Sequence, residues 1–96
     1  MNQSAFAIEV LGMLGNDYEA PKTLASDLAR ELGRDVSEAE VRAVLENLAL
    51  RGLAQAFVFE PSTGRYVPIE AAEVKGQESP WFNATPEGMA AYDTAS

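Results

Sequence analysis

The chain of 96 residues contains no cysteine and no histidine, and it has 7 lysines and arginines against 15 aspartates and glutamates. Without cysteine it can form neither disulfides nor thiolate sites. Without histidine it lacks the commonest metal ligand and the commonest general base at neutral pH. A glycine-rich loop of the kind that cradles phosphates is missing too. We therefore expect no enzyme: no catalytic residues, no metal site and no cofactor.

Long apolar runs are also missing. No segment approaches the roughly eighteen apolar residues that a membrane span needs, and the stretch before Glu9 lacks the basic residues that begin a signal peptide. A composition that is 47% hydrophobic and 23% charged is typical of a globular chain. We expect a cytoplasmic protein with no membrane contact, folded as one domain over residues 1–96.

Apolar periodicity and end signals predict the order of the secondary structure. We expect helices at about 4–14, 21–33 and 37–51, a β-hairpin at about 54–69, a mobile acidic loop at 70–80, a short strand at 81–84 and a helix at 86–92. Thr23 is a candidate cap for the second helix, and Gly33 ends it. Thr85 caps the last helix, with Pro86 at its first position.

The third helix has the clearest ends. Ser37 and Glu40 have the spacing of a capping box, in which the hydroxyl accepts from the backbone and the carboxylate reaches back. Gly52 stands where a left-handed residue closes a helix, with Leu53 after it. Farther along, Pro68 cannot donate a ladder hydrogen bond, so we expect the second hairpin strand at an edge of the sheet.

Aromatic residues concentrate in the predicted strands. Phe57 and Phe59 share one strand face, so this face is either buried or sticky. We expect Tyr66, Trp81 and Phe82 to cover the core beneath the sheet. A ligand pocket or a partner anchor is the alternative for these three residues.

Three helices followed by a hairpin is the arrangement of a winged helix-turn-helix, and several segments fit a family with that fold. These segments are Leu24–Leu28, Val41–Leu48, Arg51–Leu53 and Ala84–Met89. Through them the sequence resembles the winged-helix regulators of the PadR and MarR type. The resemblance implies an α+β fold, a winged helix-turn-helix with a three-helix core, a β-hairpin wing and a short C-terminal helix.

The resemblance also implies a transcriptional regulator that binds duplex DNA as a small homodimer, with the third helix in the major groove. By position, the DNA-contacting candidates are Lys22, Arg34, Ser37, Arg42, Ala43, Glu46, Asn47 and Arg65. Arg42 suits guanine and Asn47 suits adenine, while the cations of the second helix, the following turn and the hairpin suit phosphates. Phe6 and Tyr92 are the implied dimer contacts.

Charge supports an alternative. A strong DNA binder neutralises about six to ten phosphates, yet residues 37–51 carry two arginines against three glutamates, and residues 60–78 carry two cations against four glutamates. The alternative is an acidic winged-helix interaction module that does not bind DNA and instead engages a basic protein partner or imitates the charge of DNA. If the cations scatter or the third helix is covered, the alternative gains support.

Overall fold

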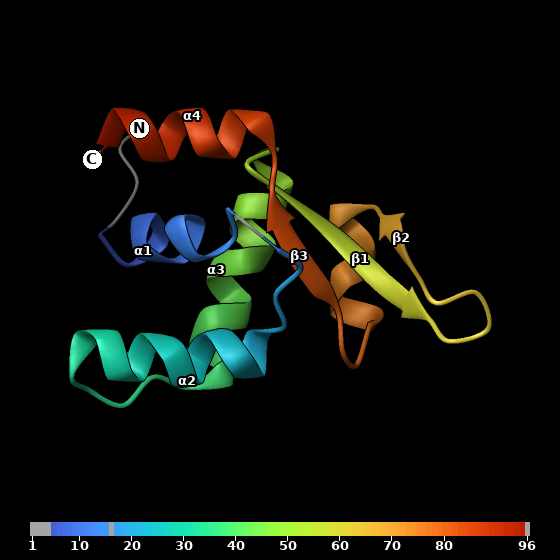
Figure 1. Ribbon diagram of the computed structural model, residues 1–96, viewed down its shortest axis with the longest axis horizontal. Helices are drawn as coiled ribbons and strands as arrows, with labels where there is room; N and C mark the ends of the chain where they lie inside the picture. The colour runs from blue at the N-terminus through green and yellow to red at the C-terminus, as the bar shows by residue number, and fades with distance from the viewer. Residues whose placement is uncertain (1–4, 16, 96) are drawn as a thin grey trace.

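The computed structural model describes residues 5–15 and 17–95. Its elements are α1 (Ala5–Met13), α2 (Pro21–Leu32), α3 (Glu38–Leu50), β1 (Ala54–Glu60), β2 (Arg65–Ile69), the 3₁₀ helix η1 (Ala71–Gly76), β3 (Trp81–Ala84) and α4 (Pro86–Ala95). The strands form an antiparallel sheet in the order β2-β1-β3. The fold is α+β, as expected, and the β1–β2 hairpin projects away from α1, α2 and α4 (Figure 1). In the described ranges, no helix is long and apolar enough to cross a membrane.

Local signals set most helix ends. Gly33 and Gly52 adopt the left-handed conformation, with φ of 66° and 75°, directly after α2 and at the end of α3. The Thr23 prediction is wrong: the cap position is Ala20, which makes no side-chain cap hydrogen bond. Pro21 occupies the first turn, where its missing N–H costs nothing, and so it starts the helix ahead of Thr23.

The core lies between the helices and one face of the sheet, which we call the inner face. Ala56 on β1 is paired with Phe82 on β3, and both side chains are almost completely buried. Residues opposite one another on paired strands point to the same side, so this side faces the helical residues of the core. Phe82 therefore covers the core, as predicted. Tyr66 and Trp81 occupy the opposite side of the sheet, and the prediction for these two residues is wrong.

The edges of the sheet differ. Glu19, between α1 and α2, exchanges two backbone hydrogen bonds with Phe82, of 2.8 and 2.9 Å, and so pairs with the outer side of β3. β2 has no partner beyond β1 in the sheet order, so it is the edge strand that Pro68 predicted.

The C-terminal helix α4 is fastened to the chain ahead of it. The Thr85 hydroxyl donates to the carbonyl of Gly52 (2.7 Å) and accepts from the backbone N–H of Gly88 (3.0 Å), which confirms the predicted cap. Tyr92 lies so close to Gly12 that a Cβ there would come within 2.7 Å of its ring. Tyr92 and Phe6, the implied dimer contacts, both pack against the core of their own chain.

The predicted acidic loop is the largest error in the fold. Residues 71–76 form η1, whose Val74 is fully buried, and Glu70 and Glu73 complete a capping box at its start. The side chain of Glu73 accepts from the backbone N–H of Glu70 at 3.0 Å. Three glutamates and the absence of apolar periodicity in residues 70–80 pointed to a loop, whereas the structure has a short helix anchored by a single buried valine.

Candidate interaction site

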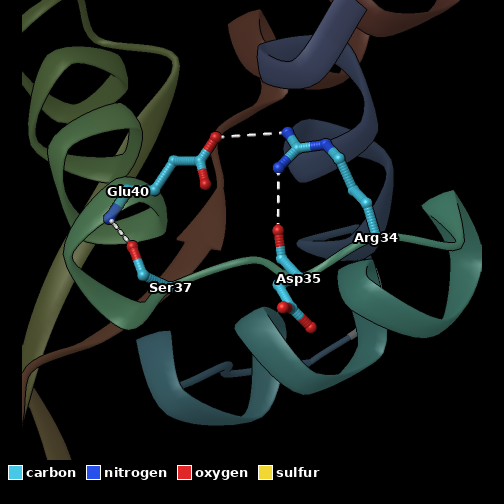
Figure 2. Close-up of polar contacts among 4 residues, drawn as sticks. All are labelled: Arg34, Asp35, Ser37 and Glu40. Carbon is cyan, nitrogen blue, oxygen red and sulfur yellow. Dashed lines mark hydrogen bonds and ion pairs between the residues drawn. The ribbon is translucent and has the colours of Figure 1, made fainter.

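Arg34 and Ser37 each contact Glu40 at the turn between α2 and α3, as Figure 2 shows. The Ser37 hydroxyl accepts from the backbone N–H of Glu40 at 3.0 Å, the first half of the predicted capping box. The second half is replaced, because the Glu40 carboxylate accepts from Arg34 at 3.2 Å. Arg34 also donates to the carbonyl of Asp35 (2.9 Å), and its guanidinium lies 5.5 Å from the centre of the Phe6 ring. Arg34 is exposed, and each of its two Nη atoms already donates one hydrogen bond to its own chain.

Arg42, the predicted guanine reader, faces η1. Its Nη2 donates to the carbonyl of Val74 at 2.8 Å and to the carbonyl of Gln77, and its Nη1 lies 3.4 Å from the carbonyl of Glu78. Its Nε lies 3.6 Å from Glu46 Oε2, and the two side chains are only 21% and 20% exposed. Arg42 therefore caps the end of η1 and holds it against α3, and any base contact would first have to break these bonds.

The exposed face of α3 carries little charge. Ala39, Ala43, Asn47 and Leu50 recur at spacings of four and three along this face, and all four are exposed. Leu50 is the most solvent-accessible large apolar residue there, at 68%. Of the residues predicted to contact DNA bases, Ala43 and Asn47 lie on this face. The only cation in α3 is Arg42, which faces η1, so α3 provides no cation on this face. The face is suited to packing against a partner rather than to neutralising phosphates.

The remaining predicted phosphate contacts are dispersed. Lys22 and Arg65 are both exposed, Lys22 in the first turn of α2 and Arg65 at the start of β2. The α2–α3 turn, which contains Arg34, and the turn of the hairpin lie at opposite ends of the molecule, whose longest extent is 38 Å (Figure 1). The structure thus links Arg34 and Ser37 only through Glu40 and places Glu46 beside Arg42, but it does not gather the cations.

An aromatic cluster that the sequence did not predict covers the other side of the sheet, which we call the outer face. Phe59 is paired with Tyr66, and Phe57 with Trp81, so all four share this face. Tyr18, from the segment before α2, stacks on Tyr66 with ring centres 4.0 Å apart and planes 13° apart. We expected the face shared by Phe57 and Phe59 to be either buried or sticky, and the two residues differ: Phe57 is buried, and Phe59 is 44% exposed. The sequence carries no signal that would place Tyr18 there.

The segment that contains Tyr18 also carries negatively charged side chains. The pKa of Glu19 is raised above its ordinary value, first by burial and then by repulsion from Asp27 and Asp17. Asp17 is exposed and accepts the backbone N–H of Tyr18 at 2.7 Å. Asp27 also accepts from Arg30 at 2.7 Å, on the surface. Burial first, and the two neighbouring carboxylates second, therefore make the Glu19 carboxylate hold its proton more tightly.

A groove of about 730 Å³ lies between the end of α3, strands β1 and β2, and η1. Its lining includes Leu50, Ile69 and Ala72, and the charged residues among its lining are Glu70 and Glu73. The groove continues from the exposed face of α3 through Leu50. Its lining is mixed, with apolar side chains such as Leu50 and Ile69 and polar side chains that include Glu70 and Glu73.

Metal binding finds no support in the described part of the chain, where no three acidic side chains gather in a way that could hold an ion. What the geometry offers instead is an aromatic sheet face, an uncharged helix face and a groove. The chain matches no protein-family model, and neither curated sequences nor solved structures show a significant similarity to it.

Proposed function

We propose that this chain is a winged-helix module that binds protein rather than DNA, and that its partner is basic. The element order supports the winged-helix assignment: α1, α2 and α3 precede antiparallel strands, and α2 packs on α3. The Glu19 segment adds a short third pairing on the far side of β3, as a first strand between the first two helices of a winged helix would. In this assignment η1 and β2 enlarge the wing.

The contact between Arg42 and η1 carries the functional proposal. In a helix-turn-helix protein the recognition helix needs free donors at base edges. Here the one cation of α3 is bonded to the carbonyls of Val74 and Gln77, and Glu46 lies beside it. With that side of α3 occupied, the helix presents two glutamates, two alanines, an asparagine and a leucine to solvent, and no cation.

Charge supports the choice of partner. The chain carries a formal net charge of −8, which repels a polyanion and attracts a polycation over distances of the order of the Debye length, about 8 Å at physiological salt. The cations available for phosphate contact lie far apart, so no basic stripe offsets this repulsion. A basic protein surface is the complementary partner.

Two measurements test the proposed function. The first is fluorescence anisotropy of a labelled duplex from the protein's own promoter region, with a scrambled duplex beside it, at low and moderate salt. We expect no binding at either salt concentration. Binding that weakens steeply with salt and is lost in Lys22→Glu would overturn the proposal in favour of a DNA-binding regulator.

The second measurement is retention of partners from an extract of the source cells on the immobilised protein, before and after nuclease treatment. We expect the retained protein to be basic and to survive the nuclease. Loss of all retained material on nuclease treatment would mean that nucleic acid was the ligand. Moderate salt should release the retained protein, because a large part of the attraction is electrostatic.

A further inference from the structure

We propose that the outer face of the sheet is the docking surface, and that it receives an arginine-containing basic segment of the partner protein. This inference rests on the proposed function and names the surface that performs it. The face is built from five of the eight aromatic residues of the chain: Tyr18, Phe57, Phe59, Tyr66 and Trp81.

The rings form one connected surface centred on Tyr66. Besides stacking on Tyr18, the Tyr66 ring meets Trp81 nearly edge-on, with centres 5.3 Å apart and planes at 76°, and meets Phe59 at 5.2 Å and 59°. Phe57 supports Tyr18 from beneath with a perpendicular contact at 4.8 Å. Each ring is thereby fixed by another, so a ligand would pay little to order the surface on binding.

The outer face has no charge of its own. Along the three strands, all of which the structure describes, the outward register positions hold Gln55, Phe57, Phe59, Tyr66, Pro68, Trp81 and Asn83. An uncharged π surface attracts a cation through the ring quadrupole, and guanidinium adds planar stacking that ammonium lacks. Arginine is therefore the basic side chain that this face recognises best.

Charge complementarity identifies the partner as basic. Tyr18 lies in the face next to the exposed Asp17, and repulsion from Asp27 and Asp17 adds to the effect of burial, which is the main reason that the pKa of Glu19 is raised. Glu60 follows Phe59 at the far end of β1, at an inner-face register position opposite Arg65, and the chain as a whole carries −8. A segment with several arginines would find rings beneath its guanidinium groups and carboxylates at the margins.

The groove beside Leu50 is the competing docking surface. Its two carboxylates belong to the capping box of η1, where the Glu73 side chain accepts from the backbone of Glu70. No aromatic ring is among the described residues that line the groove, so it offers no π surface on which a guanidinium could stack. The experiment below distinguishes binding in the groove from binding on the outer face.

The experiment titrates the protein with three peptides of equal length, built from repeats of Arg-Gly-Ser, Lys-Gly-Ser and Glu-Gly-Ser. Trp81 is the only tryptophan and lies in the face, so its fluorescence reports binding there. We expect the arginine peptide to bind at low salt and to change the Trp81 emission, and the glutamate peptide not to bind. The lysine peptide should bind more weakly by about twofold to fivefold for each guanidinium that stacks.

Variants locate the binding surface. Phe59→Ala should weaken binding of the arginine peptide by about twofold to fivefold. Val67→Ala is the matched control, because Val67 is 37% exposed on the same hairpin but lies at a register position of the opposite face. Val67→Ala should leave binding unchanged. Both variants are compared only if they keep the circular dichroism spectrum and melting temperature of the wild type. Tyr66→Leu, which retains apolar bulk, serves as a second test of the face.

Four outcomes overturn the inference. They are no binding of the arginine peptide, equal binding of the arginine and lysine peptides, equal effects of Phe59→Ala and Val67→Ala, and loss of binding in Leu50→Asp with Phe59→Ala unaffected. The last outcome would move the site to the groove. None of the four restores DNA binding, so the proposed function fails separately, through the duplex titration or through loss of the retained material on nuclease treatment.

Discussion

Replacement of Arg42 by methionine should destabilise the fold far more than replacement of an ordinary surface arginine. The substitution keeps most of the aliphatic stem and removes every donor to η1. The two short bonds, to the carbonyls of Val74 and Gln77, are charge-assisted and come from a side chain that is 21% exposed. At the lower end of the range for such bonds, each is worth about 1.5 kcal/mol.

The longer contacts add little. Nη1 lies 3.4 Å from the carbonyl of Glu78, and Nε lies 3.6 Å from Glu46 on the next turn of α3, a pair of a type worth about 0.3–0.5 kcal/mol. Water can reach some of the released carbonyls, which returns part of the cost. We therefore expect Arg42→Met to lower the free energy of unfolding by about 2–3 kcal/mol, which for a domain of this size lowers the melting temperature by about 10 °C or more.

Thermal and urea unfolding, followed by circular dichroism, measure the effect. Arg30→Met is the control, because the Arg30 side chain is 79% exposed and its bond to Asp27 lies in solvent; this change should cost less than about 0.5 kcal/mol. Amide hydrogen exchange should show faster exchange in η1 for Arg42→Met only. If the two arginine variants unfold at the same temperature, or if η1 keeps its protection without Arg42, our reasoning about this contact is wrong.

Three further predictions follow from the described contacts. Gly88→Ala should prevent folding or lower the free energy of unfolding by more than about 3 kcal/mol, because the added Cβ would overlap the carbonyl oxygen of Leu53. Gly76→Ala is the control: its Cβ would meet nothing within 4 Å, so thermal unfolding should show a cost of no more than about 1 kcal/mol. Glu19→Gln should raise the melting temperature at neutral pH. The pKa of Glu19 is raised in the folded state, so its stabilising contribution is present below the unfolded-state pKa and is lost as pH rises through the folded-state pKa. A melting temperature that differs from the wild type equally at acidic and neutral pH would contradict this assignment. Ser37→Ala removes the cap of α3 and should cost about 1 kcal/mol, whereas Ser37→Asp should keep the stability in urea unfolding.

Local signals predicted much of the fold because they act within a few residues. Gly33, Gly52, Ser37 and Thr85 each end or begin a helix through their own backbone or side chain, and each does so in the structure. η1 has a local capping box of Glu70 and Glu73, but the side chain that holds it against α3 is Arg42, which lies 32 residues from Val74. No local pattern in the acidic stretch reports such a contact.

The candidate site was less predictable than the fold. Helical spacing places Arg42 on the outside of α3, and only the tertiary arrangement reveals that η1 lies over it. The stack of Tyr18 on Tyr66 likewise depends on where the α1–α2 connection crosses the sheet. Phe57 and Phe59 could be assigned to a common face from their alternation, but their different exposure is a consequence of Tyr18 covering only one of them.

The two edges of the sheet have a consequence for solubility and for the direction from which a partner approaches. A free strand edge is a template for strand addition, the first step of edge-to-edge aggregation. At one edge Glu19 already pairs with Phe82, and at the other Pro68 offers no N–H within a strand of five residues. Growth of the sheet by another chain is thus opposed on both sides, and the broad faces remain the natural route of approach.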